Sequence, residues 1–289
     1  MRIRAIGIIG VVVAAAACSS DRAYAPPGTV LTDAQVSADV AGTAGIAAAG
    51  SLDEQGDLLG DIGISPSLNT FGQLGPAGSA NVSPSAATAP PVRPSCTYSP
   101  RPGSWTCAPF VNTHGQTVIM SYAYFDGSGN PMQTYSATAT ERVLYTSQLD
   151  GPIGDGATLT GMTHRKHQQI LTGLLGKETT RTWNGAGTSV DTSDYHTASV
   201  SRHYVGGEVD TVRNVVYPQP RTAASYPLSG QIIRVANYTA TAIGKTTETR
   251  SVSRRVVTTF NGTANVTIRT GTTTCTLHLD TRKVDGCTG

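Results

Sequence analysis

The sequence predicts an all-β protein: a single extended, curved antiparallel β-meander, forming an open sheet or a half-barrel and preceded by a disordered tether. Three observations predict this fold. Segments in which apolar and polar residues alternate recur through residues 96–289. Tight-turn residues separate these segments, and Asn261-Gly262 is the strongest hairpin signal among them. Four cysteines form two pairs, each flanking such a turn.

Residues 1–17 have the features of a bacterial lipoprotein signal peptide. Two arginines within the first four residues are followed by a small and apolar run that is too short to span a bilayer as a mature helix. Cys18 follows this run directly, as in the lipobox, although Ala15 occupies a position where leucine is commoner. We predict cleavage before Cys18 and its acylation, for example with palmitate. An ordinary signal peptide with a chance cysteine is the alternative.

Residues 18–95 differ from the rest of the chain in composition. They are rich in Ala, Gly, Pro and Ser, which cannot bury enough apolar surface to order a chain. This composition predicts a flexible tether between the lipid anchor and the folded body. Within it, Thr32 and Asp33 form an N-cap pair before two valines at helical spacing, which predicts a short helix over residues 33–49. Three glycines weaken that helix.

The body covers residues 96–289. Its first half contains one strong hairpin signal and one segment of ambiguous secondary structure. Residues 117–125 alternate, residues 126–130 supply turn chemistry, and a returning strand is predicted over residues 132–146. Residues 157–183 fit either a helix or bent strands. We favour strands, because glycines and threonines interrupt the helical pattern.

Three glycine-containing turns set the predicted registers of the second half. Gly206-Gly207, interpreted as a hairpin turn, would place His203 opposite Asp210. A Gly244-Lys245 turn would place Arg234 opposite Arg255. The Asn261-Gly262 turn, with two residues in its loop, would pair Val257 with Val266 and Arg254 with Arg269, and the next turn would lay Cys275 against Ile268 and Leu277 against Val266.

The same turns bring the cysteines together. Cys275 and Cys287 are opposed across residues 280–282, and Cys96 and Cys107 across residues 100–103, a geometry that suits a disulfide. Four cysteines allow three connectivities, and the opposed positions favour the two local bridges. An even number of cysteines beside Cys18 is typical of an oxidising compartment.

The charge balance argues against a nucleic-acid partner. Cleavage before Cys18 removes two of the 21 Lys and Arg residues, and the 19 that remain equal the 19 Asp and Glu residues. The mature chain would have no net basic field to attract a phosphate backbone.

Several segments of the body resemble segments that recur in uncharacterised lipoproteins of environmental bacteria. They are Leu175-Gly176-Lys177-Glu178-Thr179-Thr180-Arg181-Thr182-Trp183-Asn184-Gly185, Asn214-Val215-Val216-Tyr217-Pro218-Gln219-Pro220-Arg221, Tyr226-Pro227-Leu228-Ser229-Gly230 and Thr259-Phe260-Asn261-Gly262-Thr263. The resemblance covers most of the body. It implies the compartment and the fold, and it implies no activity.

The sequence offers few residues for metal or cofactor chemistry. Residues 126–130 alternate like the opening of a calcium loop, but Ala137 stands at the twelfth position, where a glutamate is needed. His164 and His167 are an odd number of residues apart, so a strand would place them on opposite faces. We expect no metal site and no cofactor.

Two sets of charged residues remain as candidate sites. His203 and Asp210 are the only catalytic candidates, and a cross-strand ion pair is the commoner reason for such a pairing. Four arginines brought together by the predicted registers would form a patch for an anionic ligand or a solvated face: Arg234, Arg254, Arg255 and Arg269.

These observations together predict a lipid-anchored protein of the bacterial cell envelope that faces the periplasm or the cell exterior. We expect it to act as a non-catalytic structural or interaction module, with an envelope protein, polysaccharide or lipid as partner. The alternatives are a carrier that holds a lipid or other hydrophobic ligand in a curved sheet, as lipid-carrying half-barrel lipoproteins do, and a weak hydrolase that uses His203 and Asp210.

Overall fold

The computed structural model describes residues 31–61 and 95–289, apart from residues 113, 155, 157, 198–200, 222–224 and 245. The predicted signal peptide, Cys18 and most of the predicted tether lie outside the described residues. The described chain forms one α-helix, α1 (Asp33–Asp61), and fourteen β-strands. No helix within the described ranges is long and apolar enough to cross a bilayer.

The strands follow one another along the body from Cys96 to Thr288. They are β1 (Cys96–Ser99), β2 (Ser104–Cys107), β3 (Phe110–Val111), β4 (Thr117–Asp126), β5 (Pro131–Met132), β6 (Thr140–Gly154), β7 (Leu159–Thr172), β8 (Thr180–His196), β9 (Ser201–Pro218), β10 (Ser229–Ile243), β11 (Thr247–Thr259), β12 (Asn265–Thr270), β13 (Thr273–His278) and β14 (Lys283–Thr288).

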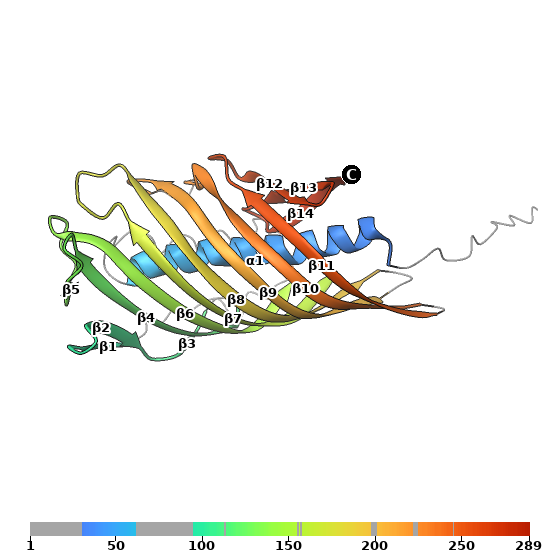
Figure 1. Cartoon of the computed structure of the whole chain (residues 1–289), viewed down its shortest axis with the longest axis horizontal. Coiled ribbons are helices and arrows are strands. Elements are labelled where there is room, and N and C mark those ends of the chain that lie inside the picture. Colours follow the sequence, from blue (N-terminus) through green and yellow to red (C-terminus); the bar gives the residue numbers. More distant parts are fainter. Residues whose placement is uncertain are drawn as a thin grey trace, which may run out of the picture.

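All fourteen strands belong to a single antiparallel sheet. Neighbouring strands pair in chain order from β1 and β2 through β4 and β6 to β14, while the two-residue strands β3 and β5 pair with β4. The sheet curves into a trough, and α1 lies along its concave side, crossing behind the strands in Figure 1. The predicted fold, one open and curved antiparallel sheet, is confirmed.

Strand alternation divides the side chains into an inner face, toward α1, and an outer face. In β7 every second residue from Thr163 to Leu171 is buried, and every residue between them is exposed. Strands are therefore the correct interpretation for most of residues 157–183. This alternation also places His164 on the outer face and His167 on the inner face, as predicted for a strand.

Helix α1 begins at a capping box. The backbone N–H of Gln35 donates to the Thr32 hydroxyl, and the backbone N–H of Thr32 donates back to the Gln35 side chain, both at 3.3 Å. The helix starts at Asp33, as the sequence indicates, but it runs for 29 residues to Asp61 instead of ending near residue 49.

The helix is part of the folded body and not of a tether. Its buried residues cover most of its circumference and include Val36, Ala44, Ala48 and Leu52, each at most 3% exposed. One stripe of the helix is half-buried: Ala38, Gly42, Ile46, Gly50 and Asp53. A helix that buries most of its surface is part of a core. The composition of residues 31–61 was misleading because small residues are what allow a helix to fit inside the trough.

Two of the helix glycines mark places where the sheet approaches closely. A Cβ added at Gly42 would lie 2.6 Å from the Tyr195 hydroxyl oxygen, and one added at Gly45 would lie 2.5 Å from a Val284 methyl. Glycine lowers the helix propensity of the segment, but at these two positions its missing side chain is needed for packing.

Some predicted strand boundaries and turns are wrong. The predicted strand over residues 132–146 is divided between β5 and the start of β6. Gly206-Gly207 is not a turn, because β9 continues through it between β8 and β10. A Cβ at Gly206 would meet the Asn237 carbonyl oxygen at 2.0 Å and the Tyr238 ring at 2.7 Å, so this glycine allows a neighbouring strand to approach.

The C-terminal registers are partly as predicted. Ile268 pairs with Cys275, and Val266 pairs with Leu277, which confirms the β12–β13 hairpin. The predicted β11–β12 register is wrong, because Val257 pairs with Arg269. The loop between β11 and β12 covers residues 260–264, so Asn261-Gly262 does not form a two-residue turn.

Both local disulfides are present. Cys96 is bonded to Cys107 across the β1–β2 hairpin, and Cys275 is bonded to Cys287 across β13 and β14. Tyr98 faces Trp105 in the first hairpin, as predicted. Each bridge therefore links an edge strand, β1 or β14, to the strand beside it.

Candidate functional site

The acidic side chains of α1 face basic side chains of the sheet. Asp39 accepts hydrogen bonds from Arg202 at 2.5 and 2.9 Å and from the Tyr204 hydroxyl at 2.6 Å. Asp33, at the exposed start of the helix, pairs with Arg250 and Arg254. Further pairs join Asp53 to Arg282 and Glu54 to Arg165 and His167.

Below the second half of α1 lies a group of buried charged side chains, which we call the ion cluster. Its seven members come from α1, β7, β8, β9 and β10, and all are at most 8% exposed. They are Glu54, Arg165, His167, Asp191, Glu208, Asp210 and Arg234. The six residues from strands occupy inner-face positions, where apolar side chains are usual. Because the strands are long, these positions lie in the middle of the trough.

His167 lies between two carboxylates at the centre of the ion cluster. Its Nε2 is 3.1 Å from Asp210 Oδ1, and its Nδ1 is 3.4 Å from Glu54 Oε2. Burial opposes the charged imidazolium, but the hydrogen bonds to Asp210 and Glu54 outweigh burial and raise the pKa of His167. His167 acts on the two carboxylates in return. Burial opposes their charged forms, but the hydrogen bond to His167 lowers the pKa of Glu54 and lowers that of Asp210 to about 2.

The cluster also contains a second buried ion pair and one further acid, Asp191. Arg234 Nη1 is 2.7 Å from Glu208 Oε2, and the Tyr238 hydroxyl donates to the other oxygen of Glu208 at 2.6 Å. Asp191 accepts a hydrogen bond from Ser189 at 2.6 Å. Burial and the charge of Glu208 raise the pKa of Asp191, which favours its protonated form.

The ion cluster is not arranged for catalysis. The His167 side chain is 1% exposed, and both ring nitrogens face carboxylates. A general base needs a nitrogen within reach of a substrate proton, and α1 covers this one. The network instead fixes α1 to the sheet, because moving the helix would leave buried charges without partners.

The predicted pairing of His203 with Asp210 is wrong. His203 lies on the outer face, with its Nδ1 2.7 Å from Asp194 Oδ1 on the neighbouring strand β8. Asp210 lies on the inner face against His167. The error follows from the Gly206-Gly207 turn, because a continuous strand carries residues 203 and 210 to opposite faces.

The predicted arginine patch is also wrong. Arg234 and Arg254 lie on the inner face, where Arg234 is 1% exposed beside Glu208 and Arg254 pairs with Asp33 of α1. Arg255 and Arg269 are exposed on the outer face. Arg255 pairs with Val235 and Arg269 with Val257, so the registers that would have gathered the four arginines do not form.

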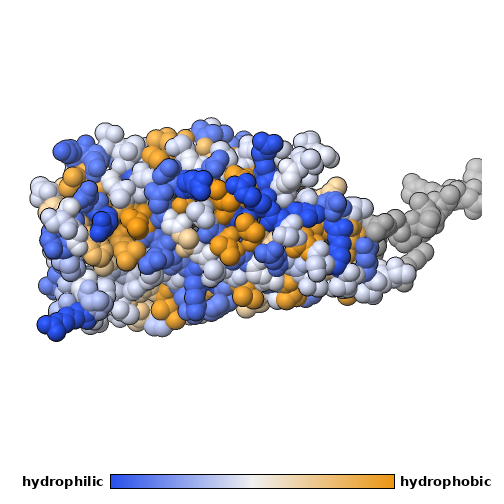
Figure 2. Space-filling model, viewed as in Figure 1, coloured by the Kyte–Doolittle hydropathy of each residue, from blue (hydrophilic) through white to orange (hydrophobic). Residues whose placement is uncertain are grey.

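The outer face of the sheet presents apolar side chains to solvent. Figure 2 shows them as separate clusters among polar residues over the strands. The exposed aliphatic side chains of this face include Val190 (61%), Val209 (54%) and Val235 (39%). Val209 and Val235 are directly opposed on β9 and β10.

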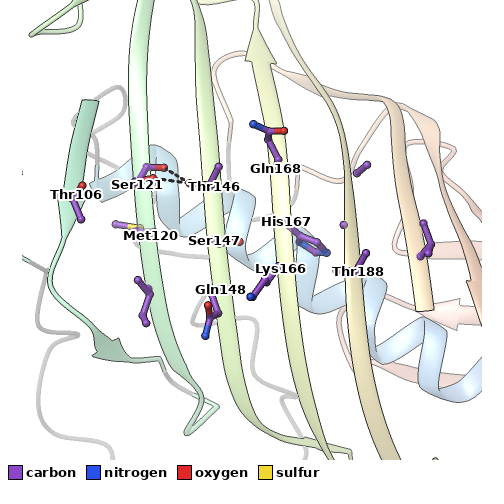
Figure 3. A pocket seen from close by; sticks show the side chains of 14 residues that line it. Thr106, Met120, Ser121, Thr146, Ser147, Gln148, Lys166, His167, Gln168 and Thr188 are labelled. Carbon is purple, nitrogen blue, oxygen red and sulfur yellow. Dashed lines mark hydrogen bonds between the residues drawn. The ribbon is translucent and has the colours of Figure 1, made fainter. Parts of the chain in front are cut away.

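A hollow of about 680 Å³ lies on this outer face over β4, β6, β7 and β8. We call it the outer hollow. Its outward-pointing lining consists of hydroxyl and amide side chains, one lysine and three small or aliphatic side chains: Thr106, Ser121, Thr146, Thr188, Gln148, Gln168, Lys166, Ile119, Ala186 and Val209. Figure 3 shows Ser121 and Thr146 joined across neighbouring strands, with their hydroxyl oxygens 2.6 Å apart.

Met120, Ser147 and His167 border the outer hollow without offering it their side chains. All three are buried on the inner face, so they contribute backbone to its floor. The outer hollow and the ion cluster are thus on opposite sides of one sheet.

Sequence reasoning missed the ion cluster and the outer hollow. The available signal was polarity on both faces of a strand: in residues 163–169 the positions 163, 165, 167 and 169 are polar, and so are 164, 166 and 168. A strand that is polar on both faces contradicts a simple apolar core. It indicates that another charged element covers one face.

In the part of the chain that the structure describes, no three His, Cys, Asp or Glu side chains are placed to hold a metal ion. Comparisons with protein-family models, with curated proteins and with solved structures found no match.

Proposed function

We propose that this protein is a lipid-anchored, non-catalytic binding module of the bacterial cell envelope, related to the lipoproteins that its sequence resembles. The basic and apolar start of the chain and the position of Cys18 support export and acylation. Two disulfides, one at each edge of the sheet, support an oxidising compartment. Only a short segment of sequence separates Cys18 from the start of α1 at Asp33. An acylated Cys18 would therefore hold the body close to the membrane.

The observation that carries this proposal is the position of α1. The concave side of the sheet, where a half-barrel carrier would hold a lipid, is occupied by the protein's own helix. Buried ion pairs such as Asp39 with Arg202 hold the helix there. The charged inner face also differs from the mainly apolar lining that a lipid cavity needs. This weighs against a carrier that fills the trough with a lipid, and it directs the search for a large envelope partner to the outer face.

The chemistry of the outer hollow favours an envelope polysaccharide as its ligand. Threonine and serine hydroxyls and glutamine amides both donate and accept hydrogen bonds, which suits a ligand rich in hydroxyl groups. Ile119, Ala186 and Val209 supply apolar surface for the C–H faces of sugar rings. Lys166 is the one charged side chain among the outward-pointing residues that line the hollow.

A sedimentation assay tests this function. The full chain carrying Cys18→Ser, which removes the acylation site, would be mixed with cell-wall polysaccharide purified from the native host and then centrifuged. We expect the chain to sediment with the polysaccharide and Ala186→Arg, which fills the hollow, to reduce the bound fraction at least tenfold. Thr239→Val, on the outer face of β10, is the matched control and should bind like the parent.

A chain that stays in the supernatant would overturn the polysaccharide as ligand. A photo-crosslinking residue at Gln168 in living cells would then show whether one membrane protein occupies the hollow instead. For the anchor, feeding cells an alkyne-labelled fatty acid should label the native chain and leave Cys18→Ser unlabelled. Equal labelling of both would refute acylation at Cys18.

A further inference from the structure

A second cavity lies where the two ends of the sheet approach each other beside α1. Arg282, in the turn between β13 and β14, contacts His114, in the loop between β3 and β4, and Asp53 of α1. Next to this contact is a cavity of about 330 Å³ between the helix and strands β6 and β7. We call it the seam cavity. It is separate from the outer hollow, because the two share no lining residue.

A helix glycine leaves room for the seam cavity. Gly50 of α1, Gly154 of β6 and Gly161 of β7 all line it, but a Cβ added at Gly154 or Gly161 would meet strand backbone at 2.1 Å. Gly50 is therefore the one of the three that leaves space on the cavity side. A Cβ added at Gly50 would have Arg165 Nη1 at 3.8 Å as its nearest neighbour, so this helix position faces open space. Since a water molecule occupies about 30 Å³, the cavity has room for roughly ten non-hydrogen atoms.

One end of the cavity has unused hydrogen-bond donors. Arg165 is 4% exposed, yet its Nε has no hydrogen-bond partner. Its Nη1 makes only a long bond of 3.4 Å to the Ala47 carbonyl and lies 3.9 Å from Glu54. Glu54 is directed instead toward His167 and Ser147. A buried guanidinium with five N–H groups and so few acceptors is incomplete without a further acceptor.

The remaining walls are apolar. Ile46 of α1 and Leu149, Pro152 and Ile153 of β6 line the same cavity. Arg282 brings a second guanidinium to it. A ligand that matches this lining has an anionic head for the arginines and an aliphatic body for the wall.

We propose that the seam cavity binds an aliphatic carboxylate of about eight carbons. The carboxylate accepts hydrogen bonds from Arg165 and Arg282, and the chain lies against Ile46, Leu149 and Ile153. This inference does not depend on the proposed polysaccharide binding, which concerns the opposite face of the sheet.

Calorimetric titration of octanoate into the full disulfide-bonded chain carrying Cys18→Ser tests the proposal. Octanoate should bind with a stoichiometry of one, and octan-1-ol, which has the same chain without the charge, should bind at least tenfold more weakly. Gly50→Leu places a side chain in the cavity and should abolish binding, while a better helix former at this position keeps the protein folded. Arg282→Gln should weaken binding about tenfold.

Arg255→Gln, which removes an exposed cation from the outer face, is the control and should bind octanoate like the parent chain. If Gly50→Leu fails to fold, Ile153→Asp replaces it, because a carboxylate on the partly exposed wall repels the ligand. Failure of the parent chain to bind octanoate, equal binding of octan-1-ol, or full binding by a folded Gly50→Leu variant would each overturn the proposal. None of these results bears on the polysaccharide assay.

Discussion

His167 is the residue whose protonation should be most visible in stability. Its pKa is raised by Asp210 and Glu54 from a reference of 6.5, so it stabilises the fold below pH 6.5 and this contribution is lost as pH rises through the folded value. Glu54 and Asp210 have lowered pKa values, so their contributions exist above their references of 4.5 and 3.8 and are lost as pH falls. We expect the free energy of unfolding to be greatest between about pH 4.5 and 6.5.

Urea unfolding of the parent, His167→Gln and His164→Gln at pH 5 to 9 checks this expectation. The parent should lose about 1.4 kcal/mol above pH 6.5 for each unit by which the pKa of His167 is raised. His167→Gln should be less stable at pH 6 and should lack the alkaline decline. His164→Gln changes an exposed histidine on the outer face of the same strand and should keep the parent's profile. An alkaline decline that persists in His167→Gln would exclude His167 as its source.

Glycine substitutions in α1 should have opposite effects at two positions. At Gly45 a Cβ would lie 2.5 Å from a Val284 methyl, so Gly45→Ala should destabilise the protein by about 1 kcal/mol after the gain in helix propensity is included. At Gly50 the space is open, so Gly50→Ala should stabilise it by about 0.5–1 kcal/mol. Thermal unfolding of the matched pair measures both, and equal shifts would contradict close packing at Gly45.

The partners of single residues could be predicted from the sequence where the two residues are close together in the chain. Cys96 with Cys107 and Cys275 with Cys287 could be paired because a short turn brings each pair together. The positions of Arg234 and Asp210 could not be predicted, because they depend on registers across several strands. A shift of one residue exchanges the two faces of a strand.

At the scale of elements, α1 is held by carboxylates whose partners lie far away in the sequence. Asp39 and Arg202 are both at most 10% exposed, and removing one partner leaves a buried charge. We expect Asp39→Asn to lower the free energy of unfolding by about 3–5 kcal/mol.

Asp33→Asn is the control for this prediction. Asp33 also pairs with arginines of the sheet, but its side chain is 81% exposed and solvent screens its charge. Urea denaturation should show a large decrease in midpoint for Asp39→Asn and little change for Asp33→Asn. A similar small effect of both would mean that the helix is not fixed by buried charge.

The β9 strand shows how a turn signal can mislead. Gly206-Gly207 matches hairpin chemistry, but the two glycines lie inside the strand. Because they have no side chains, β10 and β8 can approach β9 closely at these positions. The real irregularity of β9 is a bulge at Asn214, which has φ of +49° and lets both Val212 and Val215 face inward. Asparagine tolerates this left-handed conformation. In the sequence, however, an asparagine indicates a turn as readily as a bulge, so the bulge could not be predicted from it.

For the whole molecule, the two disulfides should protect the edges of the sheet more than its centre. Each bridge joins an edge strand to its neighbour, while strands β6 to β11 are 13 to 18 residues long. Reduction should therefore increase amide hydrogen exchange in β1, β2, β13 and β14 and leave β7 to β10 protected. Mass spectrometry of peptides before and after reduction measures this. Uniform loss of protection would show that the bridges support the entire fold.

The sequence by itself determined the fold class, the disulfide pairs and many strand positions, because alternation and turn chemistry act between close neighbours in the chain. Only the tertiary structure decided that residues 33–61 form a helix that packs inside the trough of the sheet. A segment rich in alanine and glycine has too little apolar surface to order itself, and it becomes ordered only when the sheet surrounds it and matches its carboxylates with arginines. The position of α1 in turn decided that the outer face is the side of the sheet open to a large partner such as a polysaccharide.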